Sequence, residues 1–110
     1  MRRTAFVIAL TLIAFSVLAA GTTHRKPKTH TVVMEAMVFR PAALTIRSGD
    51  TVVWVNKDIV EHTATSATAG GFDSKMIRPG QSWKHTIRSR GDVAYVCTYH
   101  PLMKGTLQVK

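Results

Sequence analysis

The chain of 110 residues has little cysteine and little negative charge. Its single cysteine, Cys97, excludes an intramolecular disulfide. Six acidic residues are outnumbered by fifteen Lys and Arg, which gives a formal net charge of +9. The sequence has no internal repeat, no helical hydrophobic period and no paired acid and base near Cys97, so neither a helical repeat protein nor an enzyme is expected. Nucleic acid is not expected as a partner, because the basic residues are scattered along the chain.

The first 20 residues have the layout of a secretory signal peptide. In "MRRTAFVIALTLIAFSVLAAG", two arginines precede an apolar run that ends in small residues. We therefore predict a signal peptide over residues 1–20, cleaved near Ala19 to Gly21, and a periplasmic mature protein. The alternative is an uncleaved anchor that would tie the protein to a membrane, although the run is slightly short for a span. Cleavage would remove Arg2 and Arg3 and lower the net charge to +7.

Short β-branched runs separated by glycine and proline turns fill the chain after residue 30. We interpret residues 21–30 as a polar tail and residues 31–110 as one monomeric domain. This pattern is typical of a small antiparallel β-sandwich or barrel, so the fold class is all-β. Strands are predicted at residues 31–39, 44–46, 51–56, 82–88, 93–97 and 106–110.

The segment "CTYHPLMKG" holds Cys97, His100 and Met103 within seven residues. Thiolate, imidazole and thioether form a soft ligand set, and two histidines, one cysteine and a distant methionine is the arrangement of blue copper sites. A second histidine is therefore required. We choose His62, because it follows the strong strand at residues 51–56, near the end of a sandwich where loops meet. The other candidates are His24 and His30, in the polar tail, and His85, which we expect to be packed and hydrogen-bonded.

Each residue has an ordinary structural explanation when it is taken alone. A lone cysteine is often a small buried hydrophobic residue, and a methionine at the end of a loop usually fills space. The metal interpretation depends on the agreement of the C-x2-H-x2-M order, the upstream histidine, the export signal and the β pattern. Zinc is the main alternative metal, but its structural sites usually take four Cys or His ligands, and Met103 would be a poor fourth.

Four segments carry a resemblance to a known family: "FRPAALTIRSGDTVVWVN" (39–56), "EHT" (61–63), "GGFDS" with "RPGQSW" (70–83) and "YVCTYHPLMKG" (95–105). Through them the chain resembles the cupredoxins, and within them the amicyanin and plastocyanin-like group. The resemblance covers nearly all of residues 31–110, and the short spacing of the ligand loop is similar to that of amicyanin. It implies a two-sheet Greek-key β-sandwich with one type 1 copper ion and an electron-transfer function.

The resemblance also implies a role for each matching residue. Cys97 is the thiolate ligand, His62 and His100 are the imidazole ligands, and Met103 is the weak axial ligand. His62 is expected to be buried, whereas His100 is expected to expose one edge through which electrons enter and leave. The expected partners are redox proteins, with a dehydrogenase as donor and a c-type cytochrome as acceptor in the amicyanin case.

The chain departs from the family pattern at Thr63, where many relatives have asparagine. We expect the Thr63 N–H to bond the Cys97 sulfur and its hydroxyl to brace the loop. The apolar surface around His100, including Tyr99 and Leu102, is the expected docking site.

A second function remains open, because several methionines could bind copper. Copper storage, delivery or sensing would use Met34, Met37 and Met76 beside the two histidines of the tail. Their ordinary explanation is core and surface methionine.

Overall fold

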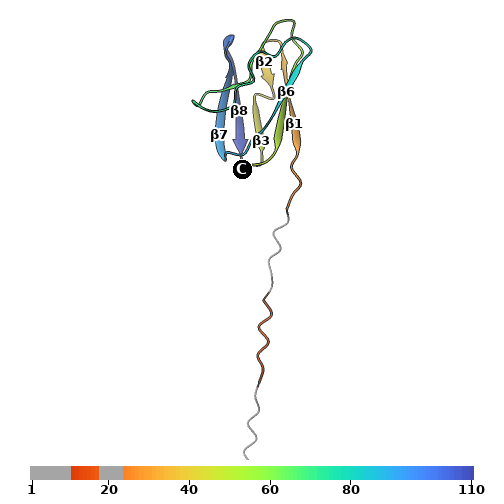
Figure 1. The fold of residues 1–110 in the computed structure, drawn as a ribbon, viewed down its shortest axis with the longest axis vertical. Helices are drawn as coiled ribbons and strands as arrows, with labels where there is room; N and C mark the ends of the chain where they lie inside the picture. The colour runs from red at the N-terminus through yellow and green to blue at the C-terminus, as the bar shows by residue number, and fades with distance from the viewer. Residues whose placement is uncertain (1–10, 18–23) are drawn as a thin grey trace, which may run out of the picture.

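The chain folds into two four-stranded β-sheets packed face to face. The computed structural model describes residues 11–17 and 24–110, and Figure 1 shows the strands stacked as a sandwich. The fold is therefore the expected all-β sandwich of Greek-key type. Within the described residues no helix has the length and apolar character needed to cross a membrane. The strands are β1 (Thr29–Glu35), β2 (Val38–Arg40), β3 (Ala43–Ile46), β4 (Thr51–Asn56), β5 (Thr65–Ser66), β6 (Ser82–Thr86), β7 (Gly91–Cys97) and β8 (His100–Val109).

The first sheet has the strand order β2-β1-β4-β6, and the second has the order β3-β8-β7-β5. Pairing is antiparallel except between β1 and β4 and between β3 and β8, which run parallel. The predicted antiparallel sandwich is therefore present, but two of its strand pairs are parallel. In β4 the apolar side chains alternate, so Val52 and Trp54 are fully buried while their neighbours are partly exposed.

Aromatic rings fill the space between the sheets. Trp54 lies edge-on to Tyr95, with ring centroids 5.5 Å apart, and Phe39 lies 4.6 Å from Tyr95. Burial raises the pKa of Tyr95 to about 12. Gly105 is paired with Tyr95 across β7 and β8, and a Cβ there would collide with the tyrosine ring. Glycine is therefore required at this position so that the ring can lie across the neighbouring strand.

The predicted single strand at residues 31–39 is in fact a hairpin. It turns at Ala36 and Met37, which both have positive φ, 54° and 63°. The carboxylate of Asp58 accepts hydrogen bonds from the N–H groups of both residues, at 2.7 and 3.0 Å. This long-range contact satisfies the two N–H groups of a turn that contains neither glycine nor asparagine, the usual residues with positive φ.

The described part of the tail is attached to the sandwich. The Asp50 carboxylate is buried and binds Arg25 through two hydrogen bonds of 2.9 and 3.0 Å. It also accepts bonds from His30 Nε2 and from the N–H groups of Lys28 and Arg47. Burial alone would raise the pKa of Asp50, but these hydrogen bonds outweigh it and hold the pKa well below its usual range.

The chain boundaries differ slightly from the predicted ones. The first strand begins at Thr29, two residues before the predicted start of the domain. The signal-peptide prediction concerns residues 1–20, of which 1–10 and 18–20 lie outside the described residues. Residues 11–17 have no regular secondary structure and are exposed to solvent.

Candidate metal centre

Three side chains from separate elements meet at one end of the sandwich. Cys97 ends β7, His100 begins β8, and His62 lies in the loop between β4 and β5. One ligand atom from each of the three lies within 4.8 Å of the others. The Cys97 sulfur is 3.7 Å from His62 Nδ1 and 3.6 Å from His100 Nδ1. Both imidazoles therefore direct the same nitrogen toward the sulfur. We call this end of the sandwich the metal end.

The other histidines considered from the sequence are not part of this cluster. His30 binds Asp50, and His24 is exposed in the tail. His85 was expected to be packed and hydrogen-bonded, but it is exposed and stacks on Trp83, with ring centroids 5.3 Å apart and planes 6° apart. Strand β6 is the edge of its sheet, which leaves His85 at the surface beside an aromatic ring.

The β7–β8 hairpin determines the spacing of the ligand loop. Cys97 pairs with His100, so Thr98 and Tyr99 form a two-residue turn. A register irregularity between Val96 and Cys97 accompanies this turn. The paired strand β8 thus begins at His100, six residues before the predicted start of the last strand. Met103 follows in the same strand and is buried.

Asp58 orients His62 from the side opposite the sulfur. Its Oδ2 atom lies 2.7 Å from His62 Nε2. Burial alone would raise the pKa of Asp58, but hydrogen bonds from His62 and from the N–H groups of Met37 and Ala36 outweigh it and lower the pKa. The ionised carboxylate can only accept, so Nε2 donates and Nδ1 keeps its lone pair, as a metal ligand requires. The role of Asp58 was not predicted from the sequence. It could have been found there, because Asp58 is a carboxylate four residues before the candidate ligand His62.

The sulfur receives one hydrogen bond from the backbone, as predicted. The Thr63 N–H donates to Cys97 Sγ at 3.3 Å. The Thr63 hydroxyl accepts a bond from the Thr98 N–H at 2.9 Å and lies 2.9 Å from the Thr65 hydroxyl. Thr63 therefore ties the loop of His62 to the turn that follows Cys97. Asparagine is not needed for this brace.

His100 differs from His62 in its exposure. His62 is completely buried, whereas His100 is half-buried at the edge of a shallow apolar hollow. The hollow has a volume of about 460 Å³, and Leu102 beside it is 95% exposed. The residues that line the hollow are Met37, Tyr99, His100, Pro101, Leu102 and Met103. The expected apolar surface around the second histidine is therefore present.

The chemistry of this cluster fits copper better than other common metals. A thiol and two imidazoles provide soft and intermediate donors, and a buried thioether is close in sequence. A structural zinc site would need a fourth cysteine or histidine. Within residues 11–17 and 24–110, His62, Cys97 and His100 are the group of His, Cys, Asp or Glu side chains whose ligand atoms are close enough to bind one ion.

Comparison with known families gives a match over most of the chain. Residues 27–110 match the family described as copper binding proteins, plastocyanin/azurin family. Amicyanin-alpha from Methylorubrum extorquens is 31% identical over 119 aligned positions, which cover 100% of both chains. Plastocyanin from Scenedesmus fuscus is 31% identical over 87 positions, which cover 68% of this chain and 89% of the relative.

Solved structures give the same result at the level of the fold. The Cu(I) form of an amicyanin mutant superposes with a TM-score of 0.70 at 26% identity, covering 74% of this chain and 82% of that one. A purple cupredoxin from Nitrosopumilus maritimus superposes with a TM-score of 0.68 at 26% identity, covering 74% of this chain and 99% of that one.

Proposed function

The chain belongs to the plastocyanin/azurin family of copper-binding proteins, and from that premise we propose that it is a periplasmic shuttle for single electrons. It is a copper electron-transfer protein and not an enzyme. We assign His62, Cys97, His100 and Met103 as the ligands of one type 1 copper ion. The observation that supports this assignment is the position of both Nδ1 atoms, 3.6 and 3.7 Å from the Cys97 sulfur.

The side chains around the centre are held so that little has to move when an electron arrives. When bound, copper supplies the Cu(II)/Cu(I) couple that accepts and releases the electron. Asp58 and Thr63 hold His62 and Cys97 through hydrogen bonds. Burial of His62 and Met103 keeps water away from that side of the site. A site held in this way lowers the reorganisation needed at each transfer.

His100 is the proposed port, because it alone of the two histidines reaches the surface. The apolar hollow beside it would lie against a partner and exclude water from the path between the two centres. Lys104 follows Met103 in β8, and the basic and acidic side chains at this end of the sandwich are equal in number. The basic side chains here are Lys57, Lys75, Arg78 and Lys104, and the acidic ones are Glu35, Asp58, Glu61 and Asp73. Docking should therefore depend on apolar contact more than on charge.

The visible spectrum and voltammetry of the copper-loaded protein test this function. A shuttle should be intensely coloured when oxidised and should give a reversible one-electron wave. A protein for copper storage, delivery or sensing should instead hold labile, colourless Cu(I). A colourless protein without a reversible wave would contradict the shuttle and favour the alternative.

Matched variants test the ligand assignment. Cys97→Ser should abolish the intense colour, because the thiolate is lost. Met103→Leu should keep the colour but change the potential, because the proposed axial ligand is weak. Met76→Leu is the control, since Met76 is 44% exposed and lies outside the cluster. Equal shifts in the two methionine variants would contradict the role of Met103.

Electron self-exchange between oxidised and reduced copies tests the port without a known partner. Leu102→Asp should slow the exchange by roughly tenfold or more, because two like charges would meet at the contact. Ile59→Asp is the control, because Ile59 is also 95% exposed but does not line the hollow. An equal loss in both variants would indicate that added charge, and not the hollow, is responsible.

Export and partners complete the proposal. We propose that residues 1–20 are a signal peptide and that cleavage occurs near Ala19 to Gly21. The mass of the protein recovered from the periplasmic fraction would test this, and an intact N-terminus in the membrane fraction would favour the anchor instead.

For partners we propose a dehydrogenase as donor and a c-type cytochrome as acceptor. Reduction by the one and oxidation by the other can be followed by the loss and return of colour.

A further inference from the structure

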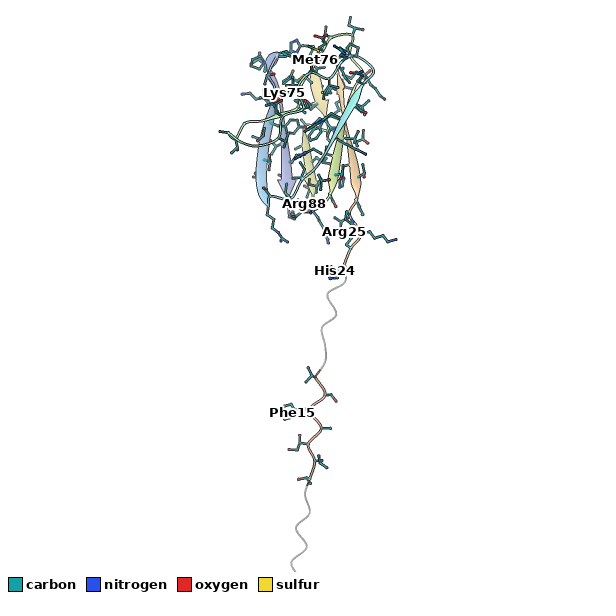
Figure 2. All side chains as sticks on the ribbon, in the orientation of Figure 1. Phe15, His24, Arg25, Lys75, Met76 and Arg88 are labelled. Atoms are coloured by element: carbon teal, nitrogen blue, oxygen red, sulfur yellow. The ribbon has the colours of Figure 1, made fainter. Side chains whose placement is uncertain are left out.

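The end of the sandwich opposite the metal end gathers much of the positive charge. Backbone hydrogen bonds bring together the tail, two loops and the last residue of the chain. The N–H groups of Thr51, Gly49 and Ser48 donate to the carbonyl oxygens of Lys28, Ile87 and Lys110, respectively. Figure 2 places Arg25 and Arg88 at this end, where the tail leaves the fold, and Lys75 and Met76 at the other. The exposed basic residues here, which we call the basic pole, are Lys26, Lys28, Arg47, Arg88, Arg90 and Lys110.

Little negative charge offsets the basic pole. The Asp50 carboxylate is buried and paired with Arg25, so its charge is cancelled within the fold. Among the described residues, Asp92 is the exposed acidic side chain at this end. When buried and paired groups are counted at both ends, the basic pole has seven Lys and Arg side chains and two Asp side chains, whereas the metal end has four basic and four acidic ones. The positive charge of the folded domain is thus concentrated away from the proposed electron port.

The shape of the basic pole suits phosphate groups. Lys28, Arg47 and Lys110 line a shallow hollow of about 290 Å³, together with the Asp50 carboxylate and its partners Arg25 and His30. The large exposed apolar side chains of the sandwich lie elsewhere, at the metal end and beside it, for example Met37, Ile59 and Leu102. A protein interface usually has an apolar core surrounded by polar residues. A charged surface without such a core fits a layer of anionic headgroups better.

We propose that the basic pole binds the anionic headgroups of a lipid membrane. The tail leaves the fold at this pole. Until the proposed cleavage near Ala19 to Gly21, the apolar run at residues 5–20 would hold the pole beside a bilayer, and after cleavage the basic side chains alone would attract it. Headgroup attraction requires no apolar insertion, and basic residues near an anionic surface each strengthen binding. Bound in this way, the domain points His100 and the apolar hollow away from the membrane. Redox partners can then reach the port.

Sedimentation with sucrose-loaded vesicles tests this orientation. The mature chain, which begins near Gly21 after the proposed cleavage, is mixed with phosphatidylcholine vesicles and with vesicles that also contain phosphatidylglycerol, so that no apolar N-terminal run contributes to binding. The anionic lipid should increase binding of the wild-type protein. In the variant Arg47→Ser, Arg88→Ser, Arg90→Ser this increase should fall by about fivefold per residue, or on the order of a hundredfold in total.

A second triple variant controls for net charge. Lys57→Ser, Arg78→Ser, Lys104→Ser removes the same three charges from the metal end, and it should keep the increase within about twofold. Replacing the three arginines of the basic pole by lysine should also keep the increase, because the charge is unchanged. All of these side chains are exposed, so the urea midpoint of unfolding should stay at the wild-type value in each variant.

Three results would overturn the proposal. Wild-type protein could bind both kinds of vesicle equally, which would mean that headgroups are not recognised. The increase in binding caused by the anionic lipid could fall equally in the two serine variants, which would mean that only net charge matters. Soluble polyglutamate or inorganic phosphate at the same charge concentration could displace the protein from the vesicles, which would assign the basic pole to a soluble anion and not to a lipid surface.

Discussion

At each end of the first sheet, one carboxylate accepts hydrogen bonds from two backbone N–H groups and one histidine Nε2. At the basic pole Asp50 binds Lys28, Arg47 and His30, and at the metal end Asp58 binds Ala36, Met37 and His62. We call these the Asp50 clamp and the Asp58 clamp. They lie at opposite ends of β1 and β4, about 20 Å apart by the length of β1.

The two clamps differ in what surrounds them. Asp50 is buried and has Arg25 as a further partner, so the charge of its carboxylate is neutralised by an ion pair. Asp58 is partly exposed and has no arginine, but its histidine has a second nitrogen 3.7 Å from the Cys97 sulfur. A carboxylate bonded to a histidine therefore does not identify a metal site. The free Nδ1 beside a thiol and a second imidazole does.

Substitution of Asp50 should have the largest effect on stability. Asp50→Asn removes the charge of the Arg25 ion pair and replaces one acceptor oxygen by an NH2 group that faces N–H donors, which should cost about 3 kcal/mol, the lower end of the range for buried pairs because Arg25 is 29% exposed. Urea denaturation of the copper-free protein measures this free energy of unfolding. Asp92→Asn, at an exposed position of the same end, should change it by less than about 0.5 kcal/mol. A similar small change for Asp50→Asn would mean that the clamp is not structural.

Acid should weaken the copper-free protein through the same clamps. The pKa values of Asp50 and Asp58 are lowered in the folded state, so their contribution to stability is fully present above the unfolded value of about 3.9. It is lost as the pH falls through the folded pKa values. The free energy of unfolding should therefore decline below about pH 4, and less steeply in Asp50→Asn. Urea denaturation at pH 7, 4 and 3 measures this, and an equal decline in wild type and variant would contradict it.

Substitution of Asp58 should affect copper more than folding. Asp58→Asn weakens the orientation of His62, and loss of such a partner typically costs 10- to 100-fold in metal affinity, or about 1.4–2.7 kcal/mol. Competition with a chelator measures the affinity for copper. Glu61→Gln is the control, because it removes the same charge from the exposed residue beside His62. If Asp58→Asn lowered only the free energy of unfolding and not the copper affinity, Asp58 would stabilise the fold as Asp50 does and would not orient His62 for the metal.

The sequence predicted the parts of this molecule that depend on local pattern. The β-branched run at residues 51–56 identified β4, and the spacing of Cys97, His100 and Met103 identified the loop that the hairpin places beside His62. His62 was chosen over three other histidines because it follows a central strand. Each of these inferences needed only neighbouring residues.

The parts that the sequence did not predict depend on contacts between distant residues. The hairpin at Ala36 and Met37 was missed because its turn contains no glycine or asparagine, and its two N–H groups are satisfied by Asp58 more than twenty residues away. The attachment of the tail depends on Asp50, which is 25 residues from Arg25. Parallel pairing of β1 with β4 likewise joins segments whose own patterns do not specify direction.

The smallest expected effects come from the turns beside the two clamps. Gly49, next to Asp50, has φ 95°, and a Cβ there would meet no atom within 4 Å. Gly49→Ala should therefore cost backbone strain of about 1–2 kcal/mol, of which the lower entropy of the unfolded chain offsets about 0.4–1 kcal/mol. At the metal end Ala36 already has φ 54°. Ala36→Gly should relieve strain of similar size, but the unfolded chain gains about 0.4–1 kcal/mol of conformational entropy, so the net stabilisation should be below about 1 kcal/mol.

A double-mutant cycle shows whether Asp58 supports this turn. If its carboxylate holds Ala36 in the left-handed region, the loss caused by Asp58→Asn should be smaller when residue 36 is glycine, because glycine adopts that conformation without support. The free energies of unfolding of wild type, both single variants and the double variant give the coupling energy. Its expected size is a few tenths of a kcal/mol or more, and its sign should correspond to a smaller loss from Asp58→Asn when residue 36 is glycine. Strict additivity would mean that the turn at residues 36 and 37 forms without help from Asp58, and the two clamps would then differ more than their shared hydrogen bonds suggest.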